Sequence, residues 1–172
     1  MTPQVAYTIG YERADEARFI ETLRANGVSS VVDTRANPTS RRPEYRQRRL
    51  QTTLLGAQIR YYWEPSLGVP KRYRPLATTN RGSFVAQYHR LLRGADDALG
   101  RVTQLTRSGQ IALLCFEADE RQCHRLPLAA ELARRAPLAF CHLRVRGSDH
   151  ADDQPVAPAM VRAKQQVQVA AR

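Results

Sequence analysis

The sequence contains few lysines and few cysteines, and it lacks a long apolar segment. Of its 27 basic residues only Lys71 and Lys164 are lysines, and the excess of arginine gives a formal net charge of +11. Guanidinium groups pair with phosphate through two parallel hydrogen bonds, so this charge favours a phosphate-bearing partner such as a nucleotide or a nucleic acid. A solvated surface encoded by a GC-rich genome is the alternative interpretation.

The three cysteines, Cys115, Cys123 and Cys141, cannot all form disulfides with one another, and two of them lie in apolar runs. This pattern is typical of a reducing compartment. The N-terminal segment lacks a basic region followed by an apolar core, and no apolar run reaches the length that spans a membrane. We therefore expect a cytoplasmic protein without a membrane partner. The oligomeric state is left open.

Hydrophobic periodicity and turn residues predict an alternation of strands and helices. The predicted strands are Val5–Ile9, Ser29–Asp33, Ile59–Trp63, Ile111–Phe116 and Leu138–Leu143. The predicted helices are Asp15–Asn26, Glu44–Leu55, a helix capped by Ser83, Asp96–Ser108 and Leu126–Arg135. This order is typical of an α/β fold, in which a mostly parallel sheet of about five strands carries helices on both faces. We assign residues 1–145 to this domain and residues 146–172 to a polar tail, in which 159–170 could form a weak helix.

Residues 64–82 form a long connection without clear periodicity. It contains three prolines and four cationic residues, Lys71, Arg72, Arg74 and Arg81. Long irregular connections in compact domains are more often functional than accidental, so we predict a binding loop or lid here. A loop without a function is the alternative.

The stretch from Cys115 to Arg125 indicates where a site should lie. Cys123, His124 and Arg125 fall at the start of a predicted helix, just beyond the C-terminal end of a buried strand. In open α/β sheets ligands bind at this edge. Free backbone N–H groups at a helix N-terminus favour an anion and lower the pKa of a cysteine thiol.

Several short motifs, taken together, resemble one protein family. They are Thr8–Tyr11, Asp33–Arg35, Pro38–Arg41, Leu67–Gly68, and Cys115–Glu117 followed by Cys123–Arg125. The combination resembles the domain of unknown function 488 family over roughly Ala6 to Arg144. That family has no assigned reaction, so the resemblance implies a fold and a candidate site. The chain departs from the common family pattern at Glu12, Thr34 and Val69, where serine, valine and glycine are frequent.

Polar residues follow three of the predicted strands and are expected to meet in one crevice. For binding an anionic substrate we assign Gly10, Tyr11, Arg35, Arg41 and Arg125. Arg35 and Arg125 would hold a phosphate beside the helix N-terminus. An internal salt bridge from these arginines to Asp33 or Glu117 is the alternative.

For catalysis we assign Asp33, Glu117, Cys123 and His124. Asp33 and Glu117 could exchange protons or hold a divalent metal ion, and a structural capping role is the alternative. Cys123 could be a thiolate nucleophile or a cysteine packed under the helix start. His124 has the pKa range for proton transfer near neutral pH, or it forms a local hydrogen bond.

The cysteine spacing does not favour zinc, and we assign no metal ligand. A zinc site would need ligands from Cys115, Cys123, His124, Cys141 and His142. The seven residues between Cys115 and Cys123 exceed the usual spacing, and adjacent Cys141 and His142 face opposite sides of a strand. Cys115 itself is predicted as a core residue. The identity of any cofactor stays open.

Two further groups could contact nucleic acid. They are the aromatic run Tyr61–Trp63 and the arginines 41, 42, 46, 48 and 49. A core strand and a solvated helix face are the alternatives. The leading hypothesis is an enzyme that acts on a phosphate-bearing substrate. The other hypotheses are a non-catalytic nucleic-acid or anion-binding module, and a thiol-based enzyme or redox sensor that uses Cys123.

Overall fold

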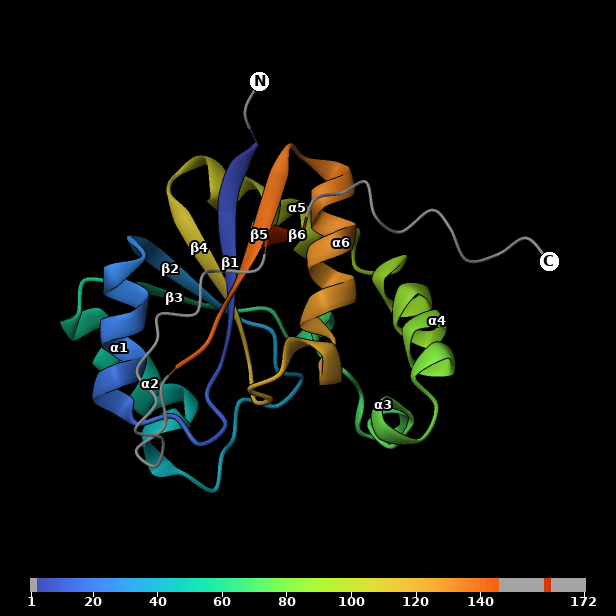
Figure 1. The fold of residues 1–172 in the computed structure, drawn as a ribbon, viewed down its shortest axis with the longest axis horizontal. Coiled ribbons are helices and arrows are strands. Elements are labelled where there is room, and N and C mark those ends of the chain that lie inside the picture. The colour runs from blue at the N-terminus through green and yellow to red at the C-terminus, as the bar shows by residue number, and fades with distance from the viewer. Residues whose placement is uncertain (1–2, 146–159, 162–172) are drawn as a thin grey trace.

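The computed structural model describes residues 3–145 and 160–161, and its centre is a parallel sheet. The parallel strands are β1 Gln4–Gly10, β2 Val28–Asp33, β3 Arg60–Trp63, β4 Gln110–Cys115 and β5 Leu138–Leu143. A short strand, β6 Met160–Val161, runs antiparallel to β5. The strand order is β3-β2-β4-β1-β5-β6 (Figure 1). The predicted α/β class is confirmed.

Helices cover both faces of this sheet (Figure 1). The helices α1 Glu16–Ala25 and α2 Gln47–Gly56 lie on one face, and α4 Arg81–Leu92, α5 Asp96–Arg107 and α6 Arg125–Arg135 on the other. Side chains alternate along a strand, so neighbouring residues supply different cores. Val31 packs in the core of α1 and α2, whereas Val32 packs in the core of α4, α5 and α6.

The connections reverse direction between β1 and β4, which are neighbours in the sheet. The chain leaves β1 through α1 on one face and leaves β4 through α6 on the opposite face. The loops after these two strands therefore diverge and leave a crevice at the C-terminal edge of the sheet. Ligands bind at such reversal points in open α/β sheets.

Two predicted helix starts needed correction. The helix α4 begins at Arg81, and Asn80 caps it by accepting a hydrogen bond from the Ser83 backbone N–H at 3.0 Å, so Ser83 is not the cap. The predicted helix 44–55 begins later, at Gln47, because a 3₁₀ turn occupies Pro43–Tyr45. Hydrophobic periodicity alone does not reveal where a helix starts, because the start depends on which side chain caps the backbone N–H groups.

The connection over residues 64–82 has more regular structure than its sequence indicates. It forms 3₁₀ turns at Pro65–Leu67 and Lys71–Tyr73 and the short helix α3 Leu76–Thr79. Within the tail, Met160 and Val161 are extended where a weak helix was expected, and the rest of that expected helix lies outside the described residues. Among the residues that the structure describes, no helix has the length and apolar character needed to cross a membrane.

Candidate functional site

A pocket of about 690 Å³ opens at the C-terminal edge of the sheet, between the loops that follow β1, β2 and β4. Buried Cys115, Cys123 and His124 line its inner wall. Four more accessible arginines, Arg41, Arg42, Arg46 and Arg74, line other parts of it. Arg74 belongs to the 64–82 connection, so that segment contributes to the wall of the pocket, and its role as a binding loop or lid stays a prediction.

Two glycines, Gly10 and Gly68, allow neighbouring backbone segments to approach closely around the pocket. A Cβ atom at Gly10 would overlap the backbone carbonyl of Glu117, and one at Gly68 would overlap the backbone of Ala36. The loop after β4 can therefore lie directly on the end of β1, and the 64–82 connection can lie on the loop after β2. Gly10, predicted to bind substrate, fixes the Glu117 loop in this way.

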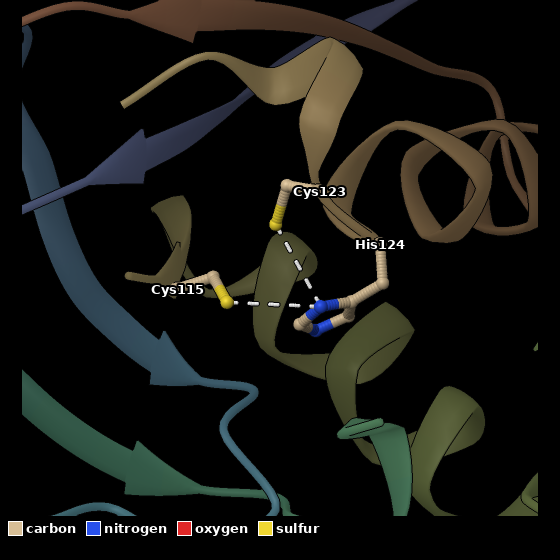
Figure 2. A group of neighbouring side chains, drawn as sticks. All are labelled: Cys115, Cys123 and His124. Atoms are coloured by element: carbon tan, nitrogen blue, oxygen red, sulfur yellow. Dashed lines mark hydrogen bonds between the residues drawn. The ribbon is translucent and has the colours of Figure 1, made fainter. Parts of the chain in front are cut away.

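Two sulfur atoms and one imidazole nitrogen meet inside the pocket (Figure 2). His124 Nδ1 lies 3.6 Å from Cys115 Sγ and 3.6 Å from Cys123 Sγ. The turn Glu120–Gln122 brings Cys123 back over the end of β4, where Cys115 is the last residue of the strand. The possible ligand atoms of these three residues all lie within 4.8 Å of one another, so the group could hold a metal ion.

A threonine fixes the orientation of the His124 ring. Thr34 Oγ1 donates a hydrogen bond to the Leu114 carbonyl at 2.8 Å and also lies 2.9 Å from His124 Nε2. Because the hydroxyl proton is already used, Nε2 must carry the proton that joins His124 to Thr34. The lone pair of Nδ1 then faces the two sulfur atoms.

The buried Arg125 guanidinium stabilises a negative charge on Cys123. Its Nε lies 3.3 Å from Cys123 Sγ, its backbone N–H lies 3.5 Å from the same sulfur, and its Nη2 donates to the Glu117 carbonyl. Within residues 3–145 no carboxylate forms an ion pair with Arg125, which is 1% exposed. A buried cation requires a compensating charge, and the Cys123 thiolate is placed to supply it.

The two thiols differ in acidity. Burial by itself would raise the pKa of Cys123, but the contacts with Cys115 and His124 and the charge of Arg125 lower it well below the ordinary value. The contact with Cys123, together with burial and the charge of Glu117, raises the pKa of Cys115. Burial and the nearby Cys123 also raise the pKa of Glu117, whose Oε2 accepts a 3.0 Å hydrogen bond from the Cys115 thiol.

Asp33 and Arg35 form a buried ion pair beside the pocket. Arg35 Nε donates to Asp33 Oδ1 at 2.8 Å and Nη2 donates to Oδ2 at 2.5 Å. The Tyr61 hydroxyl donates to the same carboxylate at 2.7 Å. Arg35 Nη1 is also occupied, by the Tyr11 hydroxyl and the Tyr45 carbonyl, each at 2.9 Å. This is the internal salt bridge that the sequence left as an alternative for Arg35.

The accessible arginines of the pocket differ in how firmly they are held. Arg42 pairs with Glu44 and lies over the Tyr45 ring, and Arg46 donates to the Ser40 carbonyl. For exposed Arg41, no hydrogen bond or ion pair occurs with the part of the chain that the structure describes. Its guanidinium can therefore turn toward an anion in the pocket without breaking a bond.

One protein-family model matches more than half of the chain. Residues 15–132 match the model described as a domain of unknown function, DUF488. The chain belongs to the DUF488 family. No curated protein and no solved structure matches the chain. The range that matches the DUF488 model includes Asp33, Cys115 and Cys123, but it begins after Gly10 and Tyr11.

Most of the side chains predicted for this DUF488 site lie around the pocket, but they do not all face it. Tyr11, Arg35, Arg41, Glu117, Cys123 and His124 line it. Asp33 is buried behind Arg35, and Arg125 lies behind Cys123. Sequence reasoning missed the contact between Cys115 and His124 and the ring-orienting role of Thr34. The sequence did carry a signal for Thr34, because it is a hydroxyl residue that directly follows a strand leading to the site.

Proposed function

We propose that this DUF488 protein is an enzyme that acts on a phosphate-bearing substrate of nucleotide size. The observation that carries the proposal is the pocket at the strand-order reversal, which combines chemically active groups inside with arginines around them. Its volume of about 690 Å³ lies in the range of small-molecule sites, roughly 300–1,000 Å³. Arginine suits a phosphate ligand because its guanidinium forms charge-assisted, bidentate hydrogen bonds with phosphate, which are strong for hydrogen bonds in proteins.

In this proposal the residues have separate tasks. Arg41 and Arg74 hold the anionic group, because both are exposed and line the pocket. Glu117 exchanges a proton, since its raised pKa brings it closer to neutral pH. Arg35 and Arg125 position Asp33, Tyr11 and Cys123 instead of contacting substrate directly.

Binding of phosphate compounds to matched variants tests the proposal. We would measure affinity by calorimetry for mononucleotides, phosphosugars and inorganic phosphate, and turnover by product analysis. The double variant Arg41→Gln/Arg74→Gln is expected to lose at least about tenfold in affinity, the equivalent of one charge-assisted hydrogen bond or more. Arg107→Gln is the control, because Arg107 ends α5 at the opposite edge of the sheet. Equal affinities of the double variant and the control would contradict the proposal.

A second groove favours nucleic acid as a further candidate ligand. It adjoins the pocket through Asn37, Thr39 and Arg46, and Arg48, Arg49 and Trp63 also line it. Trp63 is 40% exposed, and its Nε1 donates to the Arg35 carbonyl at 2.9 Å. An exposed aromatic ring beside arginines can stack on a base while the cations contact phosphates.

Tryptophan fluorescence distinguishes the two candidates, because Trp63 is the only tryptophan in the chain. Single-stranded oligonucleotides that occupy the groove should quench its emission, with an affinity that falls steeply with salt concentration. A mononucleotide confined to the pocket should leave the emission nearly unchanged. Quenching that persists unchanged in Arg48→Gln/Arg49→Gln would speak against nucleic-acid binding in the groove.

A further inference from the structure

The inner wall of the pocket presents three soft ligand atoms to one point. Cys115 Sγ, Cys123 Sγ and His124 Nδ1 lie within 4.8 Å of one another, and Figure 2 shows both sulfur atoms directed toward the nitrogen. The cysteines come from the end of β4 and from the turn that precedes α6. Their separation in sequence therefore does not limit their separation in space, which is why spacing alone did not favour zinc.

The distances match a tetrahedral zinc site. Zinc binds cysteine sulfur at about 2.3 Å and histidine nitrogen at about 2.0–2.1 Å, so a tetrahedral angle places the two ligand atoms roughly 3.6 Å apart. Both sulfur-to-nitrogen distances are 3.6 Å. Each sulfur–nitrogen pair therefore has the separation of two ligands of one tetrahedral zinc ion, and all three ligand atoms lie within 4.8 Å of one another.

The surrounding groups prepare the ligands for a metal ion. Thr34 holds the proton of His124 on Nε2, so Nδ1 offers its lone pair, as histidine ligands do when their other nitrogen is hydrogen-bonded. The backbone N–H and the Nε of Arg125 both point at Cys123 Sγ. Metal binding removes the Cys115 proton, and the divalent cation then compensates the negative charges of the two thiolates.

We propose that Cys115, Cys123 and His124 bind one zinc ion that keeps a coordination position open toward the pocket. Three protein ligands are typical of catalytic zinc sites, whereas structural sites have four. All three ligands line the pocket, so the fourth position can take a water molecule or a substrate oxygen. Sulfur and imidazole ligands select zinc over magnesium or calcium. The binding of the ion stands by itself, and its use in catalysis rests on the proposed function.

Metal titration of the full chain tests this assignment. After treatment with a chelator under reducing conditions, the protein would be titrated with zinc, followed by calorimetry, and with cobalt, followed by absorbance. We expect one equivalent of either metal per chain and a thiolate-to-cobalt charge-transfer band. Cys141→Ser is the matched control, because Cys141 is a buried free cysteine outside the group. It should bind like the wild type, while Cys115→Ser and Cys123→Ser should lose at least about a hundredfold in affinity.

Two outcomes would overturn the assignment. One is a wild-type chain that takes up neither metal, and the other is uptake that both serine variants retain. If the serine variants fail to fold, the wild-type cobalt spectrum decides, because a bound ion without a charge-transfer band has no thiolate ligand. Phosphate compounds are tested separately. If the protein binds zinc but no phosphate compound, the metal site is supported and the proposed function is refuted. If it binds a phosphate compound but no metal, the proposed function is supported and the metal site is refuted.

Discussion

Breaking the buried ion pair between Asp33 and Arg35 should destabilise the protein strongly. Asp33 is 0% exposed and Arg35 is 6% exposed, so neither charge can be solvated when its partner is removed. The variant Asp33→Asn keeps the shape of the side chain but leaves the guanidinium without its counter-charge. Removal of one partner from a buried pair costs about 3–5 kcal/mol in the free energy of unfolding. A domain of this size loses about 2–4 °C in Tm per kcal/mol, so Tm should fall by about 6–20 °C.

Urea denaturation measures this loss, and a second ion pair supplies the control. Arg121 pairs with Asp119, but its side chain is 71% exposed, so Arg121→Gln should leave the unfolding midpoint nearly unchanged. Arg35→Met removes the other member of the buried pair. The double variant Asp33→Asn/Arg35→Met should cost less than the sum of the single variants by at least about 1 kcal/mol, because each single variant leaves the other charge of the pair buried without its partner, and the double variant leaves neither.

Two results would contradict a purely structural role for the Asp33–Arg35 pair. If Asp33→Asn unfolds at the same urea concentration as Arg121→Gln, the carboxylate does not neutralise Arg35. If it also abolishes turnover, Asp33 would return as the catalytic carboxylate that the sequence predicted. An Asp33→Asn variant with unchanged stability and no turnover would thus refute the structural assignment directly.

Three further predictions follow from the described contacts. The variant Gly10→Ala forces a Cβ into the Glu117 carbonyl and should cost about 1–3 kcal/mol in unfolding free energy. The control Gly100→Ala, in α5, should not destabilise the protein, because nothing lies within 4 Å of the added carbon. Equal Tm values of the two variants would contradict this prediction. Thr34→Val removes the partner of His124 Nε2 and should weaken zinc binding about 10- to 100-fold in the same calorimetric titration. Burial lowers the pKa of His142 in the fold, so the unfolded chain binds its proton more readily and stability should fall as the pH drops below about 6.5. His142→Gln should reduce that fall in urea denaturation, and an unchanged pH dependence would exclude His142 as its source.

The order of strands and helices could be predicted because each element carries its own signal. Val31 and Val32 alternate between two cores, and the apolar faces of α1 and α5 follow the helical period. The position of β4 between β2 and β1 has no such signal, because it depends on how the helices pack between distant segments. The edge at which the pocket lies could still be predicted, since parallel strands place their C-terminal ends together.

The task of each site residue was harder to predict than its location. Arg35 reads as an anion-binding residue in the sequence, but the Tyr11 hydroxyl, the Tyr45 carbonyl and Asp33 occupy its donors in the structure. Those partners come from three separate segments, so no local pattern reveals them. Cys115 was predicted as a core residue because it lies within the apolar run of a buried strand. The prediction omits the turn at Glu120–Gln122, which brings Cys123 against it.

The pocket therefore divides into a fixed part and an adaptable part. Thr34 holds His124 and Arg125 holds Cys123 through hydrogen bonds. Thr34 directly follows β2 and Arg125 is the first residue of α6, so both partners belong to the rigid part of the fold. By contrast, Arg41 and Arg74 lie on loops with few partners among the described residues. Chemistry needs precise placement, which rigid elements supply, whereas loops can change without disturbing the core. Under the proposed function, substitutions among the arginines should change which anion is bound, and substitutions around Cys123 should change whether the reaction occurs.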